Sequence, residues 1–144
     1  MSTEENKALV RRWYEEVFNQ KKLAAVGEFC DPQIIEHDLP PGLPAGSEGT
    51  KQLIGMFLAA FPDFHITAED LIAEGDKVAS RFTVRGTHKG GFMGIPPTGK
   101  QVTMTGIQIP RIANGKMVEN WLNLDMLGLL QQLGVVPPPG QASS

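Results

Sequence analysis

The first part of the chain has apolar residues at helical spacing. Between residues 3 and 20 they recur every three or four positions, which predicts a helix with one face rich in aromatic side chains: Leu9, Val10, Trp13, Tyr14, Val17 and Phe18. Ser2 and Glu5 have the spacing of a capping box, so this helix should begin at about Thr3.

Two more helices are predicted before residue 62. A short helix over residues 23–29 should end before Asp31-Pro32, because a residue that precedes proline avoids the helical conformation. Residues 34–39 can then be extended. After a loop rich in proline and glycine, Ser47 can cap a third helix over residues 48–61, which Pro62 ends.

The pattern changes from helical to alternating at Phe64. Strands are predicted over residues 64–73, 77–88, 100–113 and 117–124, and Asn114-Gly115 is a two-residue turn typical of a hairpin. Helices followed by an antiparallel meander predict an α+β fold. Asp125 precedes a short apolar helical run. We expect residues 1–136 to form one domain and residues 137–144 to be a flexible tail.

The strand over residues 77–88 has two different faces. Val78, Phe82 and Val84 share one face and should meet the helices, whereas Arg81 and Arg85 lie on the other. A curved sheet with three helices packed on one side makes a cone, whose open mouth can hold a small-molecule pocket. The outer face of the sheet is a candidate surface for a homodimer.

Composition and charge exclude several classes of partner. The 13 basic and 16 acidic residues give a net charge of -3, and no run of Lys or Arg could follow a phosphate backbone, so nucleic acid and membrane are not expected partners. Cys30 is the single cysteine, and the chain does not start with a secretory signal, which predicts a cytoplasmic protein. Three scattered histidines make no zinc site, and no cofactor is expected.

Several segments, taken in order, resemble the SnoaL-like polyketide cyclases, a family with the nuclear transport factor 2-like (cystatin-like) fold. They are the aromatic first helix, His37, Ala60-Phe61-Pro62-Asp63, Ala73-Glu74-Gly75-Asp76, Gly86-Thr87-His88, Gly94-Ile95-Pro96-Pro97-Thr98-Gly99 and Gln131-Gln132-Leu133-Gly134. The resemblance implies a cone-shaped sheet packed on three N-terminal helices, with a short C-terminal helix. It also implies aldol ring closure without a metal or an organic cofactor.

One position departs from the family's chemistry. In these cyclases, an aspartate near the end of the last strand is the general acid/base, and Leu122 takes its place here. Leucine has no proton to transfer. Gln108 stands at a second family position, where a side-chain amide can donate a hydrogen bond to a carbonyl oxygen but cannot exchange a proton near neutral pH.

His37 and Asp125 are the remaining candidates for catalysis. Histidine is a common proton carrier in enzymes and Asp38 is adjacent, so His37 is one candidate; the alternative is a histidine bonded to nearby loop backbone. Asp125 resembles a family aspartate, but its place before an apolar helical run favours a helix cap. A pocket for a hydrophobic ligand is expected to be lined by Trp13, Phe57, Phe61, Phe92, Met104, Gln108, Trp121 and Leu122.

Two functions follow from these observations. The first is a cofactor-independent enzyme of lyase or isomerase type that closes a ring in a hydrophobic carbonyl substrate, with His37 as proton carrier and Gln108 as oxygen ligand. The second is a non-catalytic, dimeric small-molecule-binding protein of the same fold, which lost the family acid at Leu122.

Overall fold

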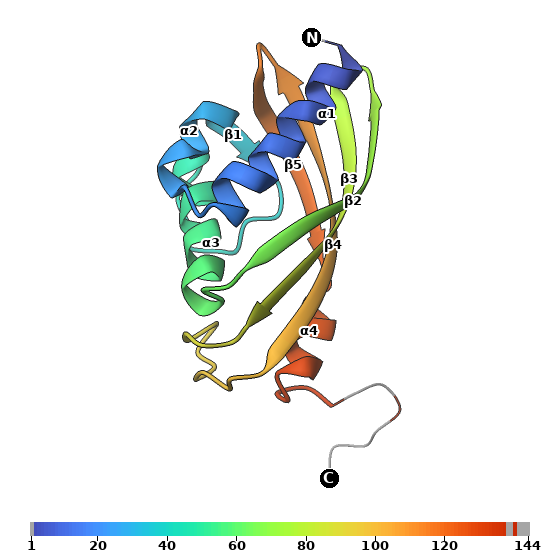
Figure 1. Cartoon of the computed structure of the whole chain (residues 1–144). Helices are drawn as coiled ribbons and strands as arrows, with labels where there is room; N and C mark the ends of the chain where they lie inside the picture. The colour runs from blue at the N-terminus through green and yellow to red at the C-terminus, as the bar shows by residue number, and fades with distance from the viewer. Residues whose placement is uncertain (1, 138–139, 141–144) are drawn as a thin grey trace.

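The computed structural model describes residues 2–137 and 140. Three helical segments cover one face of a curved five-stranded sheet, and a fourth helix lies at one end of it (Figure 1). The elements are α1 (Thr3–Arg12), η1 (Trp13–Asn19), η2 (Leu23–Ala25), α2 (Val26–Phe29), β1 (Cys30–Glu36), α3 (Ser47–Ala60), β2 (His65–Glu74), β3 (Lys77–Thr87), β4 (Gln101–Ala113), β5 (Lys116–Leu124) and α4 (Met126–Gln132). The predicted α+β fold is confirmed.

The first helix begins as the sequence predicts. Glu5 N–H donates to Ser2 Oγ and Ser2 N–H donates to Glu5 Oε1, which completes the capping box. The helix continues from α1 into the π-helical turns of η1 and ends at Asn19. Its apolar stripe packs onto the concave face of the sheet, where Val10, Trp13 and Val17 are buried.

The start of α3 corrects one prediction. The cap position is Gly46, not Ser47, and no side chain caps this helix end. Gly46 has a φ of 77°, and a Cβ there would overlap the carbonyl oxygen of Pro32 in β1. A glycine is therefore required because the helix begins in contact with the backbone of the edge strand.

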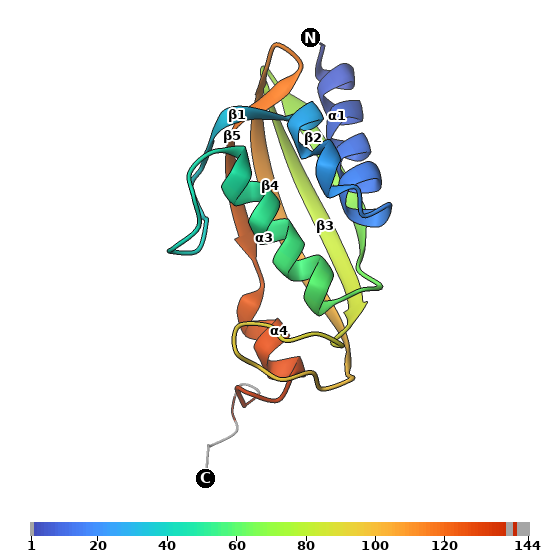
Figure 2. The ribbon, with the colours of Figure 1, turned by 90° about the vertical axis from the view of Figure 1, so that its left-hand side faces the viewer.

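The sheet has the order β1-β5-β4-β3-β2, and β2, β3, β4 and β5 pair antiparallel with one another. β1 differs from the prediction in two ways: it begins at Cys30, directly after α2, and it runs parallel to β5. Pro32 is tolerated because β1 is an edge strand with a register shift between Cys30 and Ile35. In Figure 2 the strand runs into the loop that leads to α3.

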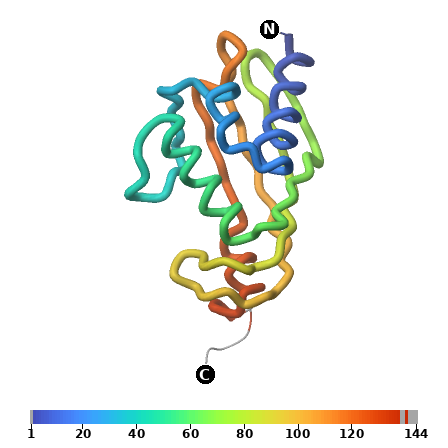
Figure 3. The backbone as a smooth tube through the Cα atoms, turned by 60° about the vertical axis from the view of Figure 1, so that its left-hand side comes forward, coloured from blue at the N-terminus to red at the C-terminus, as the bar shows by residue number. Residues whose placement is uncertain are grey.

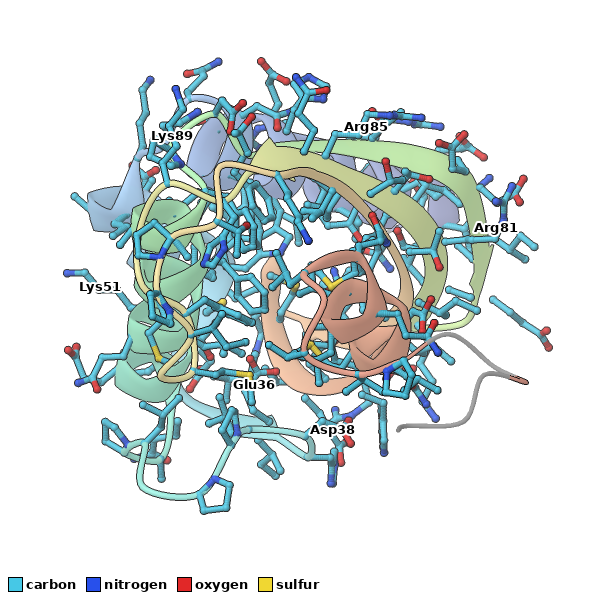
Figure 4. All side chains as sticks on the ribbon, turned by 90° about the horizontal axis from the view of Figure 1, so that it is seen from below. Glu36, Asp38, Lys51, Arg81, Arg85 and Lys89 are labelled. Carbon is cyan, nitrogen blue, oxygen red and sulfur yellow. The ribbon has the colours of Figure 1, made fainter. Side chains whose placement is uncertain are left out.

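The two faces of the sheet are as predicted. Val78, Phe82 and Val84 are at most 5% exposed and belong to the core between the helices and the sheet. Figure 4 shows Arg81 and Arg85 on the outer side. Asn114 and Gly115 both have positive φ, which confirms the predicted hairpin turn between β4 and β5.

The C-terminal helix covers the end of the sheet. Asp125 Oδ1 accepts a hydrogen bond from Gly128 N–H, which confirms Asp125 as a helix cap. Gln132 in α4 bonds both backbone groups of Thr103, where β4 extends beyond its pairing with β5. Figure 3 shows the long connection between β3 and β4 beside this helix. The predicted tail falls outside the described residues except for Pro137 and Gly140.

Candidate functional site

A small cavity lies between the helices and the concave face of the sheet, with a volume of about 70 Å³. Its wall is mostly apolar and receives side chains from η1, β1, α3 and all four later strands. The lining residues are Trp13, Tyr14, Phe18, Glu36, Thr50, Leu53, Ile54, Phe57, Phe64, Ile66, Phe82, Val84, Met104, Gln108, Asn120, Leu122 and Leu124. We call this space the inner cavity.

A second space of about 270 Å³ adjoins the inner cavity. Leu53, Phe57, Leu122 and Leu124 line both spaces and therefore stand between them. The second space, called the mouth here, is lined in addition by Asp38, Pro40, Met56, Phe92, Met93 and Met126. Met56 and Met93 are 42% and 63% exposed, so the mouth opens to solvent through flexible apolar side chains.

Gln108 brings an amide into the inner cavity. The side chain is only 6% exposed, and its Nε2 has no hydrogen-bond partner among the described residues. Buried polar groups are normally paired, so an unpaired donor on a cavity wall suits a ligand oxygen. Gln108 faces Ser80 on one side and Leu122 on the other in the strand register. The Ser80 hydroxyl is 2.6 Å from the Tyr14 hydroxyl.

Glu36 lines the inner cavity but is not among the residues predicted from the sequence. It is the last residue of β1, and Thr50 Oγ1 of α3 donates a hydrogen bond of 2.8 Å to its Oε2. Figure 4 shows Glu36 between α3 and the sheet, whereas Lys51, next to Thr50, points away from it. Side chains along a strand face alternate sides, and this explains the position of Glu36. Ile34 is buried and Ile35 is exposed, so Glu36 faces inward again.

The surroundings of Glu36 favour its protonated form. Burial against the apolar wall raises the pKa of the Glu36 carboxyl, and the nearby charge of Asp38 acts in the same direction. Hydrogen bonds from Thr50 and Asn120, and the proximity of His37, lower the pKa by less. Asn120 is the register partner of Glu36 on β5, and its Oδ1 is buried without a partner in the described part of the chain.

The predicted lining residues divide into three groups. Trp13, Phe57, Met104, Gln108 and Leu122 line the inner cavity, and Phe57 and Leu122 also line the mouth. Phe92 lines the mouth but not the inner cavity. Phe61 and Trp121 line neither of these spaces.

The positions of Phe61 and Trp121 have plain structural reasons. Phe61 packs on Gly86, where an added Cβ would lie 3.0 Å from the Phe61 Cβ, and its ring is 5.6 Å from that of His88. Trp121 follows Asn120, which faces inward, and alternation along β5 therefore places Trp121 on the outer face of the sheet.

His37 also lies outside both spaces. Its ring stacks on Trp121 with the ring centres 4.7 Å apart, and its Nε2 is 2.7 Å from Glu119 Oε2. Arg111 Nε donates to the other oxygen of Glu119, and the hydrogen bonds from His37 and Arg111 lower the pKa of that carboxyl. His37 thus belongs to a hydrogen-bonded cluster with Glu119 and Arg111 on the outer face, and this placement does not support it as proton carrier for a ligand in the cavity.

Asp125 also lies outside both spaces. Its carboxylate caps α4. No group of three or more His, Cys, Asp or Glu side chains that could hold a metal ion occurs among the described residues. The helices of the described part of the chain include none long and apolar enough to cross a bilayer.

Comparison with known proteins places this site in a family. The family model described as SnoaL-like polyketide cyclase matches residues 8–133. Nogalonic acid methyl ester cyclase of Streptomyces nogalater is 30% identical over 108 residues, which are 74% of this chain and 78% of that protein. Aklanonic acid methyl ester cyclase DnrD of Streptomyces peucetius is 31% identical over 132 residues, 88% of each chain.

Solved structures agree with the sequence relatives. TsrD from Streptomyces laurentii superposes with a TM-score of 0.86 at 26% identity, covering 94% of this chain and 99% of that one. IdmH from Streptomyces antibioticus has a TM-score of 0.77 at 36% identity, covering 90% and 99%. Both the family match over most of the chain and the cone-shaped fold show that this chain belongs to the SnoaL-like polyketide cyclase family.

Proposed function

We propose that this protein closes a ring in a hydrophobic polyketide ester by an intramolecular aldol reaction. Two relatives are methyl ester cyclases, and the apolar cavity suits a flat, carbonyl-bearing substrate. The observation that carries the proposal is the unpaired amide of Gln108 on the cavity wall. It supplies what the reaction needs at the developing enolate oxygen, a fixed donor in surroundings that exclude water.

The volumes decide how such a substrate would sit. Pockets for ligands of drug size measure about 300–1,000 Å³, and the inner cavity is well below this range. We therefore place the reacting end of the substrate in the inner cavity and its remaining rings in the mouth. Leu53, Phe57 and Leu122 would have to change rotamer on binding, because they stand between the two spaces.

An aldol closure needs only proton transfer and a hydrogen-bond donor for the enolate. The proposed reaction therefore involves no metal ion or organic cofactor, and turnover should persist in excess chelator. The product is an isomer of the substrate, since one carbon–carbon bond forms and no atom is lost.

A second function is favoured by a specific observation at Leu122. Leu122 lines both spaces, so an aspartate in its place would face the ligand, and the leucine removes that acid. The alternative is thus a small-molecule-binding protein that kept the pocket without the reaction. Saturable binding of the ester with no turnover at any pH would favour this alternative.

Gln108→Leu tests the proposal in an absorbance assay with an anthraquinone-type β-keto methyl ester. Loss of one donor to a developing oxyanion costs a factor of about 100–1,000 in rate. We expect a loss of that size for Gln108→Leu and little change for the control Gln101→Leu, an exposed glutamine at the start of the same strand. Equal rates for the two variants would contradict the role of Gln108.

A further inference from the structure

We propose that Glu36 is the catalytic proton carrier of the inner cavity, in the role that Leu122 cannot fill. This inference rests on the proposed aldol reaction and names the residue that performs its proton transfers. It depends on the position of Glu36 at the end of β1, on the polar groups that orient its carboxyl, and on the absence of another suitable side chain from the described cavity wall.

Few ionisable groups face the ligand space. Among the described residues that line the inner cavity, only Glu36 and Tyr14 can ionise. The Tyr14 hydroxyl is engaged with Ser80, and burial raises its pKa, so it stays neutral. Asp38 lines the mouth, where Leu122 N–H donates to its Oδ2 at 2.7 Å. Glu36 is therefore the candidate that the inner cavity offers.

Polar neighbours orient the Glu36 carboxyl. Thr50 holds Glu36 Oε2 from the α3 side, and Asn120 lies next to it on β5, with its own Oδ1 unpaired. Two buried amides, Asn120 and Gln108, therefore each have a free polar atom in the same cavity as the carboxyl. A cavity wall with these unpaired groups is built to bind a polar ligand rather than to fill a core.

The spacing of the strands separates the acid/base from the oxygen ligand. Glu36 pairs with Asn120, and Gln108 pairs with Leu122, two residues further along β5. β5 lies between the strands that carry Glu36 and Gln108, so their backbones are separated by two strand spacings, about 10 Å. Both side chains face the cavity, which leaves room between them for the reacting atoms of a substrate.

The charged and titratable groups around Glu36 determine its strength as a base. His37 and Asp38 follow Glu36 directly in the sequence, and the thiol of Cys30 is at the start of β1. Desolvation raises the Glu36 pKa, and Thr50 and Asn120 limit the rise. A carboxylate with a raised pKa is a stronger base than one in water, which suits removal of a proton from carbon.

The reaction steps balance without another reactant. The Glu36 carboxylate removes a proton from the carbon between two carbonyl groups, and the electron pair forms an enolate whose oxygen is held by Gln108. The enolate carbon attacks the ketone carbon, a carbon–carbon bond forms, and the ketone oxygen becomes an alkoxide. The protonated Glu36 then returns the proton to that oxygen, so the carboxylate is restored.

Glu36→Gln is the first variant, because an amide oxygen can still accept from Thr50 but cannot carry the proton. General acid/base catalysis contributes about 100–10,000-fold, so we expect a loss of at least about 100-fold. The matched control is Glu74→Gln at the exposed end of β2. If Glu36→Gln retains the rate of the natural protein while the ring still closes, the inference is overturned and the proposed function stands.

Two further variants are tested by the rate–pH profile, which a purely structural role of Glu36 would leave unchanged. Thr50→Val removes a bond that lowers the Glu36 pKa, so the rising limb of the rate–pH profile should move to higher pH. Asp38→Asn removes a charge that raises it, so the limb should move to lower pH, while the amide oxygen can still accept from Leu122. Unmoved or reversed limbs would contradict Glu36 as the titrating group.

Deuterium exchange separates the inference from the proposed function. In heavy water, Glu36 should exchange the acidic carbon-bound hydrogen of the ester even if the ring does not close. If the hydrogen exchange depends on Glu36 but the ring does not close, Glu36 is still the proton carrier and the proposed cyclase function is wrong. No exchange and no closure, with the ester bound, would overturn both.

Discussion

At the scale of single residues, the decisive contrast is between Glu36 and His37, neighbours in sequence that face opposite ways. Glu36 turns toward the cavity and Thr50, whereas His37 stacks on Trp121 at the outer face. We expect a raised Glu36 pKa to appear in stability as well as in rate, because the folded chain then binds the proton more tightly than the unfolded chain.

The sign of this stability effect follows from the raised pKa. The contribution is fully present below the ordinary pKa of about 4.5 and is lost as the pH rises through the folded-state pKa. As the pH rises from 4 to 8, the unfolding free energy of Glu36→Gln should therefore increase relative to that of the natural protein, which urea unfolding at each pH can measure. A constant difference between the two proteins would show an ordinary carboxyl.

His37→Ala should affect stability more than reaction rate. The substitution removes a stacked ring and a hydrogen bond to Glu119, which together stabilise the outer face by about 1 kcal/mol. The rate should stay within a few-fold of the natural protein. His65→Ala, at the exposed start of β2, is the control for loss of a histidine. A rate loss as large as that expected for Glu36→Gln would return His37 to the role of proton carrier.

At the scale of elements, the contact between α3 and β1 positions Thr50 against Glu36. A Cβ at Gly49 would overlap the carbonyl oxygen of Pro44 in the loop between β1 and α3, so Gly49→Ala should displace the first turn of α3, which carries Thr50. We expect a loss of about 1–3 kcal/mol in unfolding free energy, with a lower rate. Gly55→Ala on the same helix meets only Leu23 Cδ1 at 3.5 Å and should stabilise by up to about 1 kcal/mol. Similar effects of the two alanines would contradict this contact.

Local signals explain which elements could be predicted from the sequence. The Ser2–Glu5 capping box, the Asp125 cap and the Asn114-Gly115 turn each act within a few residues, and all three are confirmed. The parallel pairing of β1 with β5 joins segments more than eighty residues apart and left no local signal. The prediction of Ser47 as a cap is wrong because the requirement for Gly46 at that position arises from contact with Pro32 in β1, which is distant in sequence.

The candidate site was predictable only in part for the same reason. Residues with a clear strand or helix periodicity, such as Trp13, Met104 and Gln108, line the inner cavity as predicted. Whether His37, Trp121 and Glu36 point to the cavity or to the outer face depends on how β1 pairs with β5 and where its register shifts. Pattern alone does not give that register, so the sequence could not show that Glu36 faces the cavity and that His37 stacks on Trp121.

At the scale of the whole molecule, dimerisation through the outer face of the sheet stays a prediction. Ile107 is 48% exposed near the centre of this face on β4. We expect a mass of two chains in solution scattering at micromolar concentration, and a mass of one chain for Ile107→Asp. Gln52→Asp, at an exposed position of α3 on the opposite side of the sheet, introduces the same charge; it is the control and should leave the mass unchanged. A single-chain mass for the natural protein would contradict the prediction.

Mass spectrometry of an anthraquinone-type β-keto methyl ester, after incubation with the natural protein and with Glu36→Gln in parallel, tests the proposed chemistry most directly. After chromatographic separation, we expect a new peak of the same mass as the substrate, in which one ketone is replaced by an alcohol and a new ring, and this peak should form far more slowly with Glu36→Gln. Unchanged ester that binds saturably, or the same amount of cyclised product from both proteins, would contradict the proposed chemistry.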